Sequence, residues 1–219
     1  MVHGITDAGL GKPDYPLALE QHRNYVATLE SCGLDVVVLP PDENFPDSTF
    51  IEDACLVTPE CAVLTRPGAM TRRQEPKLLS TTIHDIGIPV ELITSPGTLD
   101  AGDVMMKGTH YYIGLSDRTN KAGALMLIKI LNKYKLTGSM VKLDSVLHLK
   151  TGISYLEQDT FLAFGEFLKK DGFRQFTLLP VDPDESYAAN SVRINDFVIV
   201  PEGFNNTADM IRSAGFKIK

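Results

Sequence analysis

The chain has 219 residues, of which 43% are hydrophobic and 22% are charged, and its formal net charge is −7. This composition is typical of a globular protein, and no apolar run approaches the roughly 20 residues that a membrane-spanning helix needs. The acidic balance argues against binding to nucleic acid, because contact with phosphates usually requires a clustered basic surface. No linker-like or low-complexity tract divides the sequence, so we expect one domain over residues 1–219.

The cysteines and the first residues bear on the cellular compartment. Cys32, Cys55 and Cys61 are an odd number without a CxxC pair, and they therefore indicate neither a disulfide framework nor a zinc knuckle. Residues 1–16 are polar and rich in glycine, and they lack the apolar core of a signal peptide. We expect a cytoplasmic protein.

The first predicted helix spans about residues 16–31, and a strand is predicted at residues 36–39. After it, the order of two short strands, a helix and a strand recurs along the chain. The strand pairs are predicted at 49–57 with 61–65, 104–106 with 111–115, 153–156 with 160–164, and 191–194 with 197–200. The helices that follow them are predicted at 72–86, 120–134, 166–170 and 205–213. The last strand of each unit is predicted at 90–93, 140–143, 176–179 and 216–219.

The predicted helices begin about forty to fifty-five residues apart, which indicates repeated ββαβ modules in a radial arrangement. Five helices imply five modules and an α/β fold. The first module lacks its strand pair, and a strand is only beginning at residue 219, so we expect a fragment that is incomplete at both ends. Open sheet edges favour self-association, for example as a homodimer, although the sequence leaves the oligomeric state open.

A segment that resembles a buried strand contains three acids within a span of seven residues: Asp47, Glu52 and Asp53. Adjacent residues of a strand face opposite sides, so Glu52 and Asp53 cannot both be solvated if one side packs on the core. Burial of an unpaired carboxylate costs several kcal/mol. Either Asp47 caps a turn and the other two acids lie on an exposed edge, or the segment lines a pocket for a cation. The second interpretation accommodates all three acids.

Two further segments offer groups for catalysis. Residues 99–103 (LDAGD) contain two acids and are also compatible with an ordinary turn. His148 has apolar neighbours, where a hydrogen-bonded core histidine is the common case. If an acid such as Asp100 meets His148 in space, the pKa of the imidazole would rise and His148 could act as a general acid and base.

Arg72 and Arg118 lie at predicted strand-to-helix connections. Each could be a solvated surface arginine. Such loops also carry the binding face of a repeat architecture, and a guanidinium group suits a ligand carboxylate. Acids at one end and arginines at the other describe a site for an amino acid with a cationic side chain.

Several sequence blocks in chain order carry a family resemblance: FPDSTFIEDACLV, LTRPGAMTRRQE, TLDAGDVM, YYIGLSDRTN, LHLK and YAANSV. From about residue 4 onward, the chain resembles the dimethylarginine dimethylaminohydrolases of the guanidino-modifying (pentein) superfamily. The resemblance implies a five-bladed α/β propeller that hydrolyses Nω-methylated arginine to citrulline and a methylamine. It implies a small guanidino amino acid as the binding partner, and neither a cofactor nor a metal.

The resemblance also assigns roles to individual residues. His148 corresponds to the general acid and base, and Asp100 to the acid that orients it. The substrate-binding positions correspond to the lid residue Leu10, to the acids Asp47, Glu52 and Asp53, which hold the guanidinium and amino groups, and to Arg72 and Arg118, which hold the carboxylate.

The nucleophile departs from the family pattern. Family members use a cysteine close to the C-terminus, after the final strand, and none of the cysteines in this sequence matches it. The resemblance therefore predicts a hydrolase whose nucleophile is missing from the 219 residues. Two alternatives remain: a non-catalytic guanidino-ligand binding protein or pseudoenzyme, and a relative of arginine deiminase or amidinotransferase. The compact length favours the hydrolase over the second alternative.

Overall fold

The computed structural model describes residues 3–6, 9 and 11–219 and contains four three-stranded sheets. In each sheet an antiparallel strand pair is followed by a third strand that runs parallel to the second. The first sheet contains β1 (Cys55–Val57), β2 (Ala62–Leu64) and β3 (Val90–Leu92); the second β4 (Val104–Lys107), β5 (His110–Leu115) and β6 (Thr137–Lys142); the third β7 (Ile153–Glu157), β8 (Thr160–Ala163) and β9 (Thr177–Pro180); and the fourth β10 (Val192–Ile194), β11 (Phe197–Ile199) and β12 (Lys217–Ile218).

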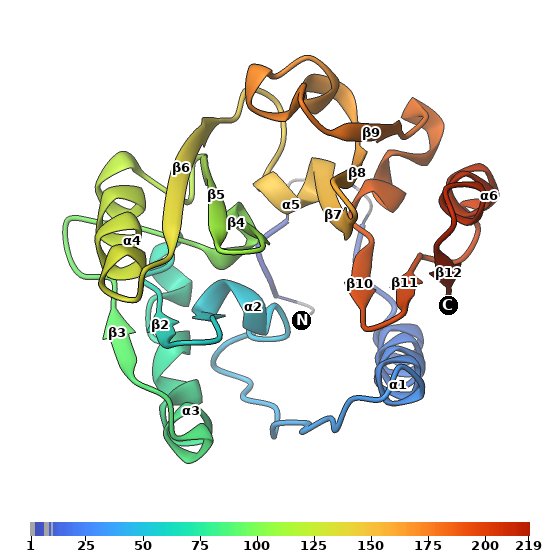
Figure 1. The fold of residues 1–219 in the computed structure, drawn as a ribbon. Helices are drawn as coiled ribbons and strands as arrows, with labels where there is room; N and C mark the ends of the chain where they lie inside the picture. Colours follow the sequence, from blue (N-terminus) through green and yellow to red (C-terminus); the bar gives the residue numbers. More distant parts are fainter. Residues whose placement is uncertain (1–2, 7–8, 10) are drawn as a thin grey trace.

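The four sheets surround a common centre, and the longer helices lie on the outer rim (Figure 1). A parallel third strand requires a crossover connection, and helices supply it in three of the sheets. These are α3 (Ser80–Ile86), α4 (Lys121–Lys133) and α6 (Asn205–Ser213), and α1 (Tyr15–Ser31) occupies the remaining sector of the ring. The arrangement confirms the predicted α/β propeller of ββαβ modules, with sheets in four sectors.

Apolar side chains hold the modules together. One cluster places Leu127 and Leu131 of α4 against Tyr111 and Ile113 of β5, and all four side chains are buried. A second cluster groups the aromatic residues Tyr112, Phe161, Phe167 and Phe173 between the second and third sheets. Removal of one such buried ring costs about 3–5 kcal/mol, so neighbouring modules stabilise one another.

Three predicted elements differ from the structure. Residues 36–39 form no strand, and Val37 and Val38 are 75% and 60% exposed, because no strand in the described part of the chain pairs with them. The predicted helix at 72–86 begins instead with short 3₁₀ turns at Met70–Arg72 and Glu75–Leu79. The predicted helix at 166–170 is replaced by two 3₁₀ turns, Gly165–Leu168 and Asp171–Phe173.

A fourth difference bears directly on function. A short helical turn precedes the first strand of every sheet: α2 (Ile51–Ala54), η3 (Ala101–Asp103), α5 (Leu149–Gly152) and η6 (Pro183–Ala189). Successive turns contact one another, and α2 and α5 lie on the inner side of the ring (Figure 1). The acids at 52 and 53 are therefore on a helical turn, and the prediction of a strand beginning at residue 49 is wrong.

Within the described residues, no helix is both long enough and apolar enough to cross a membrane.

Candidate active site

Asp53 is held from two sides at the inner face of α2. Its Oδ2 atom accepts a hydrogen bond from Nη1 of Arg72 at 2.7 Å, and its Oδ1 atom accepts one from the backbone N–H of Gly102 at 2.9 Å. Only 7% of Asp53 is exposed. Arg72 thus supplies a counter-ion for Asp53 from within the chain, which the sequence argument for a cation did not include.

Arg72 is itself buried and engaged by several acceptors. Its Nη2 and Nε atoms donate to Oε2 of Glu75 at 2.8 and 3.0 Å, and Nη2 also donates to the carbonyl oxygen of Phe50 at 3.1 Å. Burial disfavours the charged guanidinium, but Glu75 and Asp53 outweigh this effect and raise the pKa of Arg72. Arg72 thus serves the protein's own acids, and sequence reasoning missed Glu75, although its i,i+3 spacing from Arg72 is a recognisable signal.

Asp47 and Glu52 differ in exposure. Asp47 is buried, and its Oδ1 atom accepts a hydrogen bond from the backbone N–H of Ile5 at 2.9 Å. The side chain of Glu52 is 64% exposed and forms an ion pair with Lys150 of α5. Successive residues of a helix differ by about 100° in direction, so Glu52 can face outward while Asp53 faces inward. Lys150 was not predicted from the sequence.

His148 immediately precedes α5, and its side chain is 15% exposed. Its Nδ1 atom lies 3.4 Å from Oδ2 of Asp103, within ion-pair distance but without the alignment of a hydrogen bond. The Asp103 carboxylate is fixed by the Ser116 hydroxyl, which donates to Oδ2 at 2.6 Å, and by the backbone N–H of Leu149, which donates to Oδ1 at 3.0 Å. The structure therefore places Asp103 against Nδ1, whereas the sequence suggested Asp100.

Asp100 nevertheless belongs to the same cluster. Its Oδ1 atom accepts a hydrogen bond from the backbone N–H of Gly68 at 2.8 Å, and Asp100 is only 1% exposed. Burial raises the pKa of Asp100, although the Gly68 N–H opposes this effect. Asp53, Asp100 and His148 each offer one atom, and these atoms all lie within 4.8 Å of one another. Such a trio has the donor atoms for a divalent cation, and its carboxylates equally suit an organic cation.

The carboxylates determine the charge of His148. Burial alone would lower the pKa of the imidazole, but the facing Asp103 together with Asp53 and Asp100 outweighs burial and raises it. The imidazole therefore stays protonated to a higher pH than a free histidine, which suits a group that donates a proton.

Arg118 lies in the loop that follows β5. Arg118 is half-buried, and its side chain forms no ion pair with any carboxylate of the described chain. The Ser116 hydroxyl that donates to Asp103 also accepts the backbone N–H of Arg118 at 3.0 Å. The predicted site residue Leu10 lies outside the described residues.

The cysteines do not contribute to this cluster. All three are buried free thiols. Burial raises the pKa of Cys55 to about 11 and also raises the pKa of Cys61. A thiol of this kind is a poor nucleophile at neutral pH, as expected from the sequence.

Comparison with known proteins identifies the family. A sequence model described as arginine deiminase matches residues 46–200. The dimethylarginine dimethylaminohydrolase of Pseudomonas aeruginosa is 49% identical over 220 residues, which cover 100% of this chain and 86% of that protein. The chain belongs to the arginine deiminase family, in its dimethylarginine dimethylaminohydrolase branch. A dimethylarginine dimethylaminohydrolase of Streptomyces coelicolor is 36% identical over 158 residues, covering 72% of this chain and 61% of that protein.

Solved structures agree with membership of this branch. A mutant of the Pseudomonas aeruginosa dimethylarginine dimethylaminohydrolase, with serine in place of a cysteine and in complex with citrulline, has a TM-score of 0.98 and 49% identity. It is matched over 100% of this chain and 86% of that chain. The N-terminal domain of a cyanobacterial arginine dihydrolase, at 20% identity and a TM-score of 0.87 over 99% of this chain and 84% of that chain, shares the fold alone. The family resemblance and the fold class predicted from the sequence are confirmed.

Proposed function

We propose that this protein hydrolyses Nω-methylated arginine, with asymmetric dimethylarginine as its substrate and citrulline and dimethylamine as its products. The observation that carries this proposal is the 49% identity to a dimethylarginine dimethylaminohydrolase over the whole of this chain, combined with a TM-score of 0.98 to a citrulline complex of such an enzyme. The charge of the candidate site supports the same substrate class.

Carboxylates dominate the surroundings of His148. Asp53, Asp100 and Asp103 are all buried near the imidazole, and within this group only Asp53 is paired with Arg72. A buried excess of negative charge is costly, and a cationic guanidinium lowers that cost. We therefore place the substrate guanidinium beside Asp53 and Asp100, within reach of His148.

The remaining predicted residues are divided between the two ends of the substrate and the support of Asp53. Arg118, which has no ion pair within the described chain, is assigned to the substrate carboxylate. Asp47 is assigned to the amino group, and Glu52 to the guanidinium side, where Lys150 must give up its ion pair. Arg72 contributes by holding Asp53 in place, since its own guanidinium is already engaged. Leu10 keeps its predicted place in the lid.

The proposed reaction follows the family chemistry. A cysteine thiolate adds to the guanidinium carbon, and dimethylamine leaves as the His148 imidazolium donates a proton to its nitrogen. A covalent thiouronium intermediate results. Water then adds to this carbon while His148 accepts one of its protons. Cleavage of the C–S bond releases citrulline and regenerates the thiolate, and the second proton of the water passes to solvent. Asp103 and Asp100 keep the imidazole charged and oriented.

The nucleophile is assigned by the family resemblance to a cysteine near the C-terminus of family members. The thiols of Cys55 and Cys61 are unsuited to this role because burial raises their pKa values. An activity assay should therefore compare the 219-residue chain with the same chain extended to the end of its natural reading frame.

The test measures citrulline formed from asymmetric dimethylarginine, with unmethylated arginine as the competing substrate. We expect the extended protein to prefer the methylated substrate and His148→Gln to remove turnover. His84→Gln, which changes an exposed histidine on the outer helix α3, is the matched control and should keep full activity. Preference for arginine would instead indicate a deiminase, and binding without turnover in the extended protein would indicate a non-catalytic binding protein.

The cellular compartment and the oligomeric state are two further proposals. We assign the protein to the cytoplasm, because its three free thiols suit a reducing compartment. We also propose that it forms a homodimer, because the exposed Val37 and Val38 have no strand partner in the described part of the chain. Sedimentation velocity over a wide dilution range would test this, and a monomer throughout would contradict it.

A further inference from the structure

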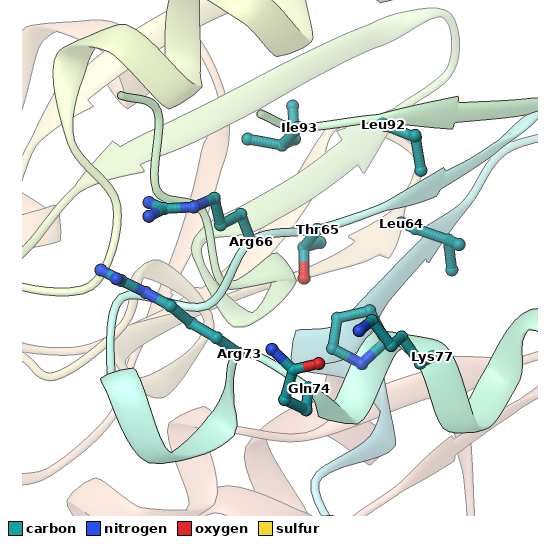
Figure 2. A pocket seen from close by; sticks show the side chains of 9 residues that line it. Leu64, Thr65, Arg66, Arg73, Gln74, Lys77, Leu92 and Ile93 are labelled. Atoms are coloured by element: carbon teal, nitrogen blue, oxygen red, sulfur yellow. The ribbon is translucent and has the colours of Figure 1, made fainter. Parts of the chain in front are cut away.

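A cavity with both charged and apolar lining residues lies near the candidate active site, between the first sheet and the turns that follow β2. It has a volume of about 380 Å³ and is lined by Leu64, Thr65, Arg66, Arg73, Gln74, Pro76, Lys77, Leu92 and Ile93. This volume is within the range of small-molecule pockets. Figure 2 shows the guanidinium groups of Arg66 and Arg73 on the same side of the pocket, and Leu64 and Leu92 on the other side.

All charged residues that line this cavity are positive. Arg66, Arg73 and Lys77 contribute three cations, and no carboxylate lines the cavity. None of the three forms an ion pair with a carboxylate among the residues that the structure describes. In a chain with a formal net charge of −7, a pocket that gathers unpaired cations needs an explanation.

The two arginines are partly fixed in place. Nη1 of Arg66 donates to the carbonyl oxygen of Gly97 at 3.1 Å, and Nε of Arg73 donates to the carbonyl oxygen of Pro67 at 3.3 Å. Both residues are half-buried. Each guanidinium thus donates one N–H group to the backbone, and its other N–H groups can donate to a further acceptor. Because the backbone hydrogen bond already restricts the side chain, less entropy is lost when an anion binds.

We propose that this cavity binds a small organic dianion, a dicarboxylate or a phosphomonoester, between Arg66, Arg73 and Lys77. Guanidinium forks match the oxygen atoms of carboxylates and phosphates. The aliphatic side chains of Leu64, Leu92 and Ile93 offer an apolar surface to the uncharged part of such a ligand. The site is separate from the active site, because Arg72 points to Asp53 and Glu75 while Arg73, the next residue, lines the cavity.

The test uses succinate and glycerol 2-phosphate as probes at low ionic strength, followed by amide chemical shifts in the 219-residue chain. We expect saturable shifts at Thr65, Gln74 and Ile93 with at least one probe, and the tighter probe identifies the anion class. Higher salt should weaken this binding, because screening reduces attraction between partly exposed charges. Absence of saturable binding for both probes would overturn the proposal.

Variants locate the bound anion. Arg66→Gln and Arg73→Gln should each weaken binding about tenfold or more, because each removes a charge-assisted hydrogen-bond donor. Arg212→Gln, which removes the same charge from the exposed surface of α6, should change the affinity less than about twofold. Arg118→Gln should also leave binding intact; loss of binding in this variant would place the anion in the active site and refute the separate site.

Circular dichroism on each variant checks that the fold is retained. If Arg73→Gln does not fold, Lys77→Gln provides the same test from an exposed position. Binding that survives in every variant that retains the fold would contradict the proposal.

Discussion

Replacement of Arg72 by methionine tests the buried charge cluster most sharply. The substitution keeps much of the side-chain volume but removes the donors to Asp53 and Glu75, which are 7% and 3% exposed. Removal of one partner from a buried ion pair typically costs about 3–5 kcal/mol, because the remaining charge is left uncompensated. Since domains are stable by about 5–15 kcal/mol, Arg72→Met should remove a large part of the free energy of unfolding.

Urea denaturation followed by circular dichroism measures this loss. With a slope of about 2–3 kcal/mol per M, we expect the midpoint to fall by about 1–2.5 M. Arg212→Met is the matched control, because Arg212 forms an exposed pair with Asp209 and such pairs contribute about 0–1 kcal/mol. Equal midpoints for the two variants would refute the assignment of Arg72 as the counter-ion of the buried acids.

The pH dependence of the Arg72→Met penalty provides a second criterion. Burial already raises the pKa of Glu75 beside Arg72, and removal of Arg72 should raise it further. An acid with a raised folded-state pKa destabilises the fold above that pKa, and the penalty shrinks as pH falls through it toward the unfolded-state value. The difference in free energy of unfolding between wild type and Arg72→Met should therefore be smaller at pH 5 than at pH 8. A difference that grows as the pH falls would contradict the model of two uncompensated carboxylates.

Two other predictions concern the same site, and a third concerns the buried thiol of Cys55. In an NMR titration the pKa of His148 should lie above the ordinary histidine value, and Asp103→Asn should lower it. The raised pKa stabilises the folded protein below the unfolded-state pKa of His148, and this stabilisation is lost as pH rises through the folded-state pKa. Gly102→Ala should weaken substrate binding, because a Cβ atom there would lie 2.7 Å from Oδ1 of Asp53 and 3.2 Å from Cγ of His148. Iodoacetamide should leave Cys55 unmodified in the native protein at pH 7, because a thiol with a pKa of about 11 is ionised in only about one molecule in ten thousand.

Each of these predictions has a result that would contradict it. An unchanged pKa of His148 in Asp103→Asn would show that Asp103 does not set the charge of the imidazole. Gly172→Ala, where an added Cβ atom meets nothing within 4 Å, is the control for Gly102→Ala, and equal ligand affinity in the two variants would refute the steric argument. Rapid alkylation of Cys55 in the folded protein would contradict its burial.

The repeated order of strands and helices could be predicted from the sequence. The apolar patterns of β5, α4 and β6 extend over six, thirteen and six residues, which is long enough for periodicity to be visible. The turns at the centre of the ring could not be predicted in this way. α2 has four residues, and its neighbours Phe50 and Cys55 to Val57 are common in strands, so local preference indicated a strand. The contacts of Asp53 with Arg72 and Gly102 are long-range and override that preference.

The residue types of the site were predicted better than their partners. Sequence patterns indicated acids, arginines and His148 in one site, and the structure brings Asp53, Asp100 and His148 together. The choice between Asp100 and Asp103 depends on the direction of side chains around one 3₁₀ turn, which sequence spacing does not specify. Likewise, the pairing of Glu52 with Lys150 joins residues 98 positions apart, and local pattern carries no information about such a contact.

We propose that the site splits the bond between the guanidinium carbon and a methylated nitrogen. Incubation of the extended protein with asymmetric dimethylarginine, with citrulline and dimethylamine measured in the same sample, tests this claim most directly. We predict equal amounts of the two products and no ammonia. Citrulline accompanied by ammonia, or no citrulline at all, would contradict the claim.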